Sequence, residues 1–276
     1  MIIKIFKRGV YAVLLAGIAC AVSYQVPAET VLITGSNRGI GYEFAKQYAA
    51  RGWTVIATHR RTKTPESLAK LAAEYPKVRV ERMDVTDAAQ IEALGAKLKG
   101  MPIDVLLSNA GLVRTDPLDK PGGNANQLFG TLDYELLDEF VHTNVAGPLK
   151  ICETFMDNVR AGKQKKIVAI SSAAASISLP PFMPNGSPVP DHYWYRITKT
   201  ALNSAMRLVS SQFREEGVIV VMFHPGGIRV DSFGELEVSG LESAEDAIGK
   251  MIRTIDGLSI ADTGRFMFSD GKDHPW

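Results

Sequence analysis

The chain has little cysteine, little histidine and almost no net charge. Its 276 residues include 2 cysteines and 5 histidines, and its formal net charge is +1. Neither Cys20 nor Cys152 has metal-ligand spacing and the histidines are scattered, so no metal site is expected; no disulfide framework is possible if a leader holding Cys20 is cleaved. The balanced charge, and the lack of a nucleic-acid motif, repeat or low-complexity run, argue against a nucleic-acid partner.

Long apolar runs are also scarce, and the one at the amino terminus is short for a membrane span. Residues 9–22 form an apolar run of about 14 residues behind a basic flank. Small residues at 21–23 and 26–28 offer cleavage sites, which is the layout of a secretory signal peptide. We therefore expect residues 1–28 to be a signal peptide or a retained membrane anchor. Residues 29–276 would then be secreted, periplasmic or membrane-held; a cytoplasmic protein with a misassigned start is the alternative.

From about residue 30 onward, short apolar segments alternate with helical patterns. Strands are predicted at Val31–Gly35, Thr54–Arg60, Val78–Val85, Ile103–Leu107, Lys166–Ile170, Val218–Phe223 and Arg265–Phe268, and helices at Tyr42–Arg51, Pro65–Tyr75, Asp87–Lys99, Leu132–Arg160 and about Trp194–Glu216. Continuous apolar strands that alternate with helices are typical of a parallel sheet covered on both faces. The sequence therefore predicts an α/β protein: a single doubly wound Rossmann domain with a seven-stranded, mainly parallel sheet.

A glycine-rich turn joins the first predicted strand to the first predicted helix. Gly35 allows a tight turn, Gly39 lets a pyrophosphate approach the backbone, and Gly41 lets the helix pack closely on the strand. Four residues complete the Gly-x-x-x-Gly-x-Gly spacing, namely Ser36, Asn37, Arg38 and Ile40. Such a triplet alone is usually an ordinary turn, but at a strand-to-helix junction it predicts a cofactor site.

Tyr195 and Lys199 are four residues apart in a helical pattern, so their side chains share one helix face. A nearby cation favours phenolate, and lowering a tyrosine pKa by about three units requires about 4 kcal/mol. A tyrosine tuned in this way exchanges a proton with a carbonyl or hydroxyl oxygen near neutral pH. The pair alone is more often a surface contact, so its meaning depends on the rest of the chain.

Further motifs follow in order and at regular spacing. They are Thr34–Gly41, Asp84, Ser108–Gly111, Asn144, Ser172, Tyr195, Lys199 and Pro225–Gly226. With these motifs in register, the chain from about residue 30 resembles the short-chain dehydrogenase/reductase superfamily. Tyr193–Asn203, His224–Gly226 and Gly271–Trp276 are similar to its carbonyl-reductase-like branch, which includes the sniffer and C-factor proteins.

The resemblance implies roles for these residues. Tyr195 would be the general acid/base, and Ser172 would donate a hydrogen bond to the substrate oxygen. Lys199 would bind the nicotinamide ribose, and Asn144 would kink its helix and hold a water linking Lys199 to solvent. The implied cofactor-binding residues are Gly35, Ser36, Asn37, Arg38, Gly39, Ile40, Gly41, Arg60, Asp84, Val85, Asn109, Ala110, Gly111, Tyr195, Lys199, Pro225, Gly226 and Ile228.

Several of these residues have simpler alternatives. Ser171 is the residue most easily confused with Ser172, and Asp84 would either lie near the adenine or cap the next helix. Asn109 is expected to be a structural clamp behind the cofactor. The alternative for Asn144 is an ordinary exposed helical asparagine.

The residues after the second strand favour NADP(H) over NAD(H). NAD-binding proteins usually place an acid there for the ribose 2′-hydroxyl, but Thr58–Arg61 contains none and the next carboxylate is Glu66. Arg38 and Arg60 carry guanidinium groups that suit a 2′-phosphate, although a solvated basic loop is the alternative. An exported NADP(H) enzyme would also need a cofactor source that the sequence does not explain.

Taken together, the residues predict an oxidoreductase that moves a hydride between NADP(H) and a small-molecule carbonyl or secondary alcohol. The alternative is a catalytically weak nucleotide-binding signalling or interaction protein of C-factor type. Val230 stands where the family commonly places a threonine against the nicotinamide, so the hydroxyl of that contact is missing from this chain. Residues 112–130, 177–194 and 229–242 are expected to form the substrate pocket. The resemblance also implies a homo-oligomer, and the leader implies a possible membrane contact.

Overall fold

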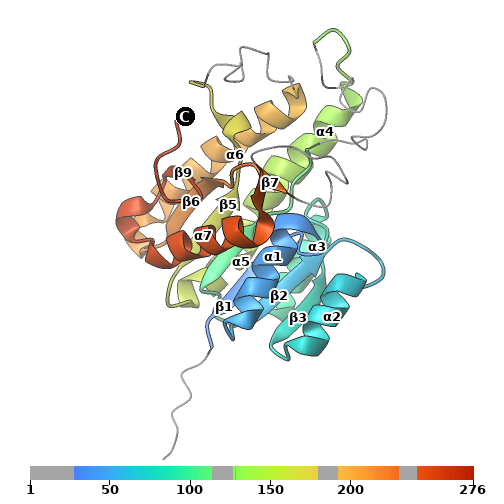
Figure 1. Cartoon of the computed structure of the whole chain (residues 1–276), viewed down its shortest axis with the longest axis vertical. Coiled ribbons are helices and arrows are strands. Elements are labelled where there is room, and N and C mark those ends of the chain that lie inside the picture. Colours follow the sequence, from blue (N-terminus) through green and yellow to red (C-terminus); the bar gives the residue numbers. More distant parts are fainter. Residues whose placement is uncertain (1–27, 114–126, 128, 180–191, 230–240) are drawn as a thin grey trace, which may run out of the picture.

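Seven parallel strands form the central sheet of the computed structural model, which describes residues 28–113, 127, 129–179, 192–229 and 241–276 (Figure 1). In spatial order they are β3 (Val78–Arg82), β2 (Thr54–His59), β1 (Thr30–Ile33), β4 (Val105–Ser108), β5 (Lys166–Ile170), β6 (Ile219–His224) and β9 (Phe266–Phe268). Every neighbouring pair is parallel. The predicted seven-stranded sheet is therefore confirmed.

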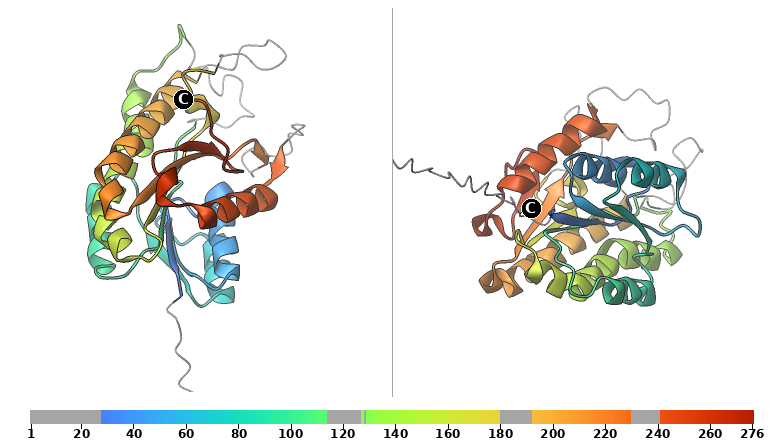
Figure 2. Two further views of the ribbon diagram at one scale, coloured as in Figure 1. Left: turned by 90° about the vertical axis from the view of Figure 1, so that its left-hand side faces the viewer. Right: turned by 90° about the horizontal axis from the view of Figure 1, so that it is seen from below.

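Helices cover both faces of this sheet, as the right-hand view of Figure 2 makes plain. One apolar core lies under α1 (Gly39–Ala50), α2 (Glu66–Glu74) and α7 (Ala244–Gly257). The other lies under α3 (Ala88–Lys97), α5 (Gly147–Ala161) and α6 (Tyr193–Gln212). Strands β1, β4 and β5 are buried along their whole length, which is why they read as unbroken apolar runs in the sequence.

The order of the strands reverses between β1 and β4. From β1 the chain proceeds outward to β2 and β3, whereas from β4 it proceeds the other way to β5 and β6. Loops at the carboxyl ends of β1 and β4 therefore diverge and leave a crevice between them. In open parallel sheets this reversal is where ligands bind.

The structure corrects the prediction of one long helix over Leu132–Arg160. The segment consists of α4 (Glu135–Val141), a π-helical turn at His142–Ala146 and α5. A π-helical turn holds one residue more than an α-helical turn, and such turns are common at functional sites. Helix α7 was not predicted; the short strands β7 (Ile228–Arg229) and β8 (Glu242–Ser243) precede it.

Several sequence predictions fall on residues that the structure does not describe. They are nearly all of the leader at 1–28, Val230, and most of the three segments expected to form the substrate pocket, 112–130, 177–194 and 229–242. Among the described residues, no helix is long and apolar enough to cross a membrane.

Candidate active site

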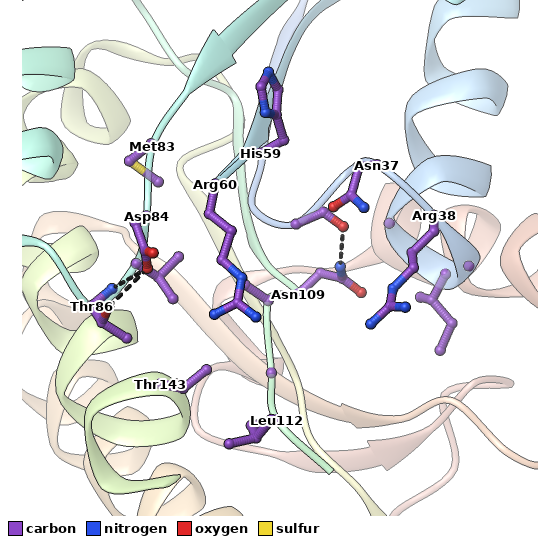
Figure 3. A pocket seen from close by; sticks show the side chains of 17 residues that line it. Asn37, Arg38, His59, Arg60, Met83, Asp84, Thr86, Asn109, Leu112 and Thr143 are labelled. Atoms are coloured by element: carbon purple, nitrogen blue, oxygen red, sulfur yellow. Dashed lines mark hydrogen bonds between the residues drawn. The ribbon is translucent and has the colours of Figure 1, made fainter. Parts of the chain in front are cut away.

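A cavity of about 290 Å³ opens at the carboxyl ends of β1, β2 and β4, where the strand order reverses (Figure 3). Its lining residues are Gly35, Asn37, Arg38, Gly39, Ile40, Gly41, His59, Arg60, Met83, Asp84, Val85, Thr86, Asn109, Ala110, Gly111, Leu112 and Thr143. Most of the residues predicted to bind a cofactor are thus brought together in one place.

The glycine-rich turn has the backbone geometry that its sequence predicts. Gly35 and Gly39 have φ angles of +68° and +54°, in the left-handed region that favours glycine. A Cβ atom on Gly41 would lie 2.3 Å from the Gly35 carbonyl oxygen. Ser36 is the exception among the turn residues, because its buried hydroxyl donates to the Ile33 carbonyl oxygen at 2.8 Å and does not line the cavity.

Asn109 fastens the end of β4 to this turn. Its Nδ2 donates to the carbonyl oxygens of Thr34 and Gly35 at 2.9 and 3.2 Å. The hydroxyl of Thr34 in turn accepts from the backbone amides of Asn109 and Ala110, both at 3.0 Å. This arrangement matches the expected clamp, since it fixes the separation of the two strands that flank the crevice.

Asp84 lines the cavity and does not cap the next helix. Its Oδ1 accepts from the amide of Thr86 at 3.0 Å and from the hydroxyl of Thr86 at 2.8 Å. Asp87 caps α3 instead, by accepting from the amide of Gln90 at 3.1 Å. The carboxylate of Asp84 therefore stays at the cavity wall.

Two arginines face the cavity without a carboxylate partner. Arg38 on the glycine-rich turn and Arg60 after β2 are exposed, and neither forms an ion pair within the described ranges. Figure 3 shows both guanidinium groups extending toward the same side of the cavity. Burial lowers the pKa of the neighbouring His59, so the arginines carry the positive charge of this wall at neutral pH.

Lys199 is buried on α6, one helical turn after Tyr195. Its Nζ donates to the Ile170 carbonyl oxygen at 2.8 Å, at the end of β5, and lies 5.8 Å from the centre of the Tyr195 ring. Burial lowers the pKa of Lys199 to about 8 because the charged form loses hydration. The ammonium is thus close to its titration point near neutral pH.

The expected lowering of the Tyr195 pKa is not what the structure gives. Burial raises this pKa, and a hydrogen bond with the Ser172 side chain opposes the rise. The physical reason is that the ammonium of Lys199 is directed to Ile170, while the phenol loses solvent. Tyr195 is therefore a neutral phenol at neutral pH, which suits it to donate a proton.

Ser172 and Ser171 point to different surroundings. The Ser172 hydroxyl accepts a hydrogen bond from the amide of Ala174 at 3.1 Å and also interacts with the Tyr195 side chain. The Ser171 hydroxyl is buried and donates to Asn203 Oδ1 at 2.6 Å. Of the two serines, Ser172 is therefore the one beside the phenol.

Asn144 lies in the π-helical turn and is 1% exposed, which removes the exposed-asparagine alternative. Its Nδ2 donates to the Leu112 carbonyl oxygen at 2.9 Å and to Thr198 Oγ1 at 3.0 Å. Its Oδ1 accepts from the amide of Leu112 at 2.7 Å. A Cβ atom on Gly111 would lie 3.3 Å from Lys199 Nζ and 3.4 Å from Asn144 Oδ1, so both groups abut this glycine.

Other predicted site residues lie outside the cavity lining. Of the catalytic candidates, Asn144 and Lys199 abut Gly111 of the lining. Tyr195 lies beside Lys199 and Ser172 lies beside Tyr195, whereas Pro225, Gly226 and Ile228 follow β6. Five lining residues were not among the predicted cofactor-binding residues: His59, Met83, Thr86, Leu112 and Thr143. The first four lie next to or near predicted residues at strand ends, and this position in the sequence could have identified them. Thr143 lines the cavity because of the π-helical turn, which was not predicted.

The fold and this geometry have counterparts among known proteins. The profile of the family described as short chain dehydrogenase matches residues 29–238. The chain belongs to the short-chain dehydrogenase/reductase family. It is accordingly an oxidoreductase of that family, with the Rossmann-like fold that its sheet order displays.

Three similar proteins define its place more closely. The short-chain dehydrogenase/reductase atnB of Arthrinium sp is 28% identical over 270 residues, which cover 88% of this chain and 98% of atnB. The C-signal protein of Myxococcus xanthus is 29% identical over 175 residues, which cover 63% of this chain and 93% of that protein. The NADPH-bound carbonyl reductase from chicken fatty liver is 30% identical, with a TM-score of 0.77, covering 91% of this chain and all of that one. The chain belongs to the carbonyl-reductase-like branch.

Proposed function

We propose that this protein transfers a hydride between NADP(H) and the carbon of a carbonyl or secondary alcohol. The observation that carries the proposal is the cluster of Tyr195, Ser172 and Lys199, in which the Lys199 ammonium lies beside Gly111 of the cavity wall. A neutral phenol can donate a proton to a carbonyl oxygen, a hydroxyl can donate a hydrogen bond to the same oxygen, and an ammonium with a lowered pKa can replace the proton. The likeness to a reductase that was solved with NADPH adds support.

The chain's own residues fit a nucleotide with a 2′-phosphate. The glycine-rich turn presents backbone amides that no side chain covers, and a phosphate can approach them closely. The turn is so tight that a Cβ atom on Gly41 would clash with the Gly35 carbonyl oxygen. Arg38 and Arg60 have no described ion-pair partner and would hold the additional phosphate through charge-assisted hydrogen bonds. The absence of an acid at the end of β2 removes the group that would repel this phosphate.

When bound, NADPH supplies the hydride, and the protein's residues handle the proton. Tyr195 donates its phenolic proton to the substrate oxygen, while the Ser172 hydroxyl donates a hydrogen bond to the same oxygen. The carbonyl carbon gains the hydride and the oxygen gains the proton, which gives the alcohol. Lys199 then returns a proton to Tyr195. Asn144, which lies next to Gly111 as Lys199 does, helps to hold the path by which Lys199 is reprotonated.

A substrate screen with the full-length protein tests this proposal. Aldehydes, ketones and quinones are offered with NADPH, and the loss of NADPH absorbance is followed for each. We expect turnover with at least one class, and a rate at least about 100-fold lower with Tyr195→Phe. NADPH binding without turnover of any carbonyl would contradict the proposal and favour a nucleotide-binding signalling protein, the class suggested by the likeness to C-signal.

A further inference from the structure

Helix α6 starts close to the catalytic candidate Tyr195 and lacks a side-chain cap of its own. It begins at Tyr193, and no side-chain hydrogen bond from the preceding His192 caps it. Backbone amides in the first turn of a helix have no partner within the helix and need an outside acceptor. For Tyr195 that acceptor is Gln127, whose Oε1 receives the Tyr195 amide hydrogen at 3.2 Å.

Gln127 is buried and uses both ends of its amide. The residue is 1% exposed, and its Nε2 donates to the Val113 carbonyl oxygen at 3.1 Å. Val113 lies in the segment that leaves β4, directly after Leu112. One side chain thus ties the wall of the cofactor cavity to the backbone of Tyr195.

A second amide makes a parallel connection between the same two parts of the fold. The Asn144 side chain accepts from the Leu112 amide, and it donates to the Leu112 carbonyl oxygen and to the Thr198 hydroxyl. That hydroxyl donates to the Trp194 carbonyl oxygen at 2.7 Å. The β4 exit and the first turn of α6 are therefore joined twice, through Gln127 on one side and through Asn144 on the other.

We infer that Gln127 is a positioning residue for Tyr195, an inference that rests on the hydride-transfer function proposed above. Gln127 fixes the first turn of α6 relative to the cavity wall, and with it the distance between the phenol and a substrate oxygen. Catalytic groups displaced by about 1 Å can lose rate by about 100-fold. Loss of Gln127 is therefore expected to lower kcat and leave NADPH affinity unchanged, because Gln127 does not line the cofactor cavity.

The test compares Gln127→Ala with Asn158→Ala in the full-length protein. Asn158 is a matched control, because it is also a buried amide, 5% exposed, whose Nδ2 donates to the carbonyl oxygens of Leu98 and Met101 at 2.7 and 2.8 Å. It lies on α5, and its partners precede β4, whereas the Gln127 partner Val113 follows that strand. Both changes remove a satisfied buried amide, so both are expected to lower the melting temperature.

Three readouts distinguish positioning from general stability. We expect Gln127→Ala to lower kcat about 10- to 100-fold, to leave the Kd for NADPH within about twofold, and to speed hydrogen exchange of the Tyr195 amide. Asn158→Ala should change none of these. In Gln127→Glu, the ionised carboxylate accepts from Tyr195 but cannot donate to Val113, so activity relative to the original protein should recover as pH falls and the carboxyl regains a proton.

The outcomes separate this inference from the proposed function. Unchanged exchange at Tyr195 in Gln127→Ala would overturn the inference, as would an unchanged kcat or an equal loss in Asn158→Ala. If the original protein turned over no carbonyl, the proposed function would fail. Because exchange needs no turnover, unchanged Tyr195 exchange would still overturn the structural role of Gln127.

Discussion

Lys199 Nζ lies 5.8 Å from the centre of the Tyr195 ring, while its hydrogen bond is made to the backbone. The spacing of four residues brings the two side chains to one helix face, as the sequence predicts. Burial nevertheless acts on both groups in the direction of their neutral forms, raising the pKa of Tyr195 and lowering that of Lys199. At neutral pH the pair is therefore a neutral phenol next to an ammonium whose pKa, about 8, lies just above that pH.

The rate of carbonyl reduction should depend on pH through Lys199. Its pKa is lowered to about 8, so the ammonium is present below that pH and is lost above it. Because the protonated form resupplies Tyr195, kcat should be constant below about pH 8 and fall as pH rises further. Steady-state kinetics at saturating NADPH across pH 6–10 measures this. Lys199→Arg should lower kcat at every pH, because a guanidinium keeps its proton and cannot return one to Tyr195; a wild-type kcat that does not fall at alkaline pH would exclude this role.

Cofactor preference should depend on Arg38 and Arg60. Hydrogen bonds between charged groups contribute about 1.5–3 kcal/mol each, so replacing both with alanine should weaken NADPH binding by roughly 100-fold or more. NADH binding should change little, because NADH has no 2′-phosphate. Titrations of both cofactors measure the difference, with Arg61→Ala as the control, since Arg61 is exposed and does not line the cavity. An equal loss for both cofactors would indicate contacts with the shared pyrophosphate.

Gly41→Ala should damage the cofactor site through sterics alone. The new Cβ would lie 2.3 Å from the Gly35 carbonyl oxygen and 2.4 Å from Asn109 Nδ2, so the turn and the clamp must shift. We expect a lower melting temperature and the loss of detectable NADPH binding. Gly249→Ala on α7 is the control, because its nearest atoms lie at 3.5 Å and alanine favours a helix by up to about 1 kcal/mol. Normal NADPH binding by Gly41→Ala would show that the turn adapts.

Removal of residues 1–28 should leave an active, soluble domain. Strand β1 begins at Thr30, and Glu29 already contributes its carbonyl oxygen to the Thr54 amide at 2.9 Å. We propose that the leader directs export or membrane attachment and is cleaved near Ser23 or Ala28. Amino-terminal sequencing and fractionation of the native protein measure this. An intact Met1 in a soluble cytoplasmic fraction would contradict both export and anchoring, and an aggregated truncation would show that the leader packs on the domain.

Much of the fold follows from local patterns in the sequence. Apolar strands such as β1 and β5 are buried on both faces, so their runs are unbroken and easily recognised. The π-helical turn at His142–Ala146 was not predicted, because one extra residue in a turn leaves the apolar spacing of the flanking helices nearly unchanged. Helix α7 was overlooked although Ile248, Met251, Ile252 and Ile255 have helical spacing and are buried.

The site residues that directly follow a strand could be predicted from the sequence. Gly35, Asn109 and Asp84 follow strand ends, which parallel topology brings together. The Tyr195 pKa was predicted in the wrong direction, because burial and the direction of the Lys199 hydrogen bond depend on tertiary packing. Gln127 was missed for the same reason, since its two hydrogen bonds join segments that are 14 and 68 positions away in the chain.

The central claim is that Tyr195 donates the proton in hydride transfer, and Tyr195→Phe tests it most directly. The change keeps the ring and removes only the hydroxyl, so NADPH binding should persist while general acid catalysis, worth about 100- to 10,000-fold, is lost. Tyr193→Phe is the control, two residues earlier on α6. The measurement is kcat for a carbonyl substrate found with the original protein, alongside the Kd for NADPH. The account predicts a kcat at least about 100-fold lower with an unchanged Kd; a kcat within about tenfold of the original, or 1.4 kcal/mol, would contradict it.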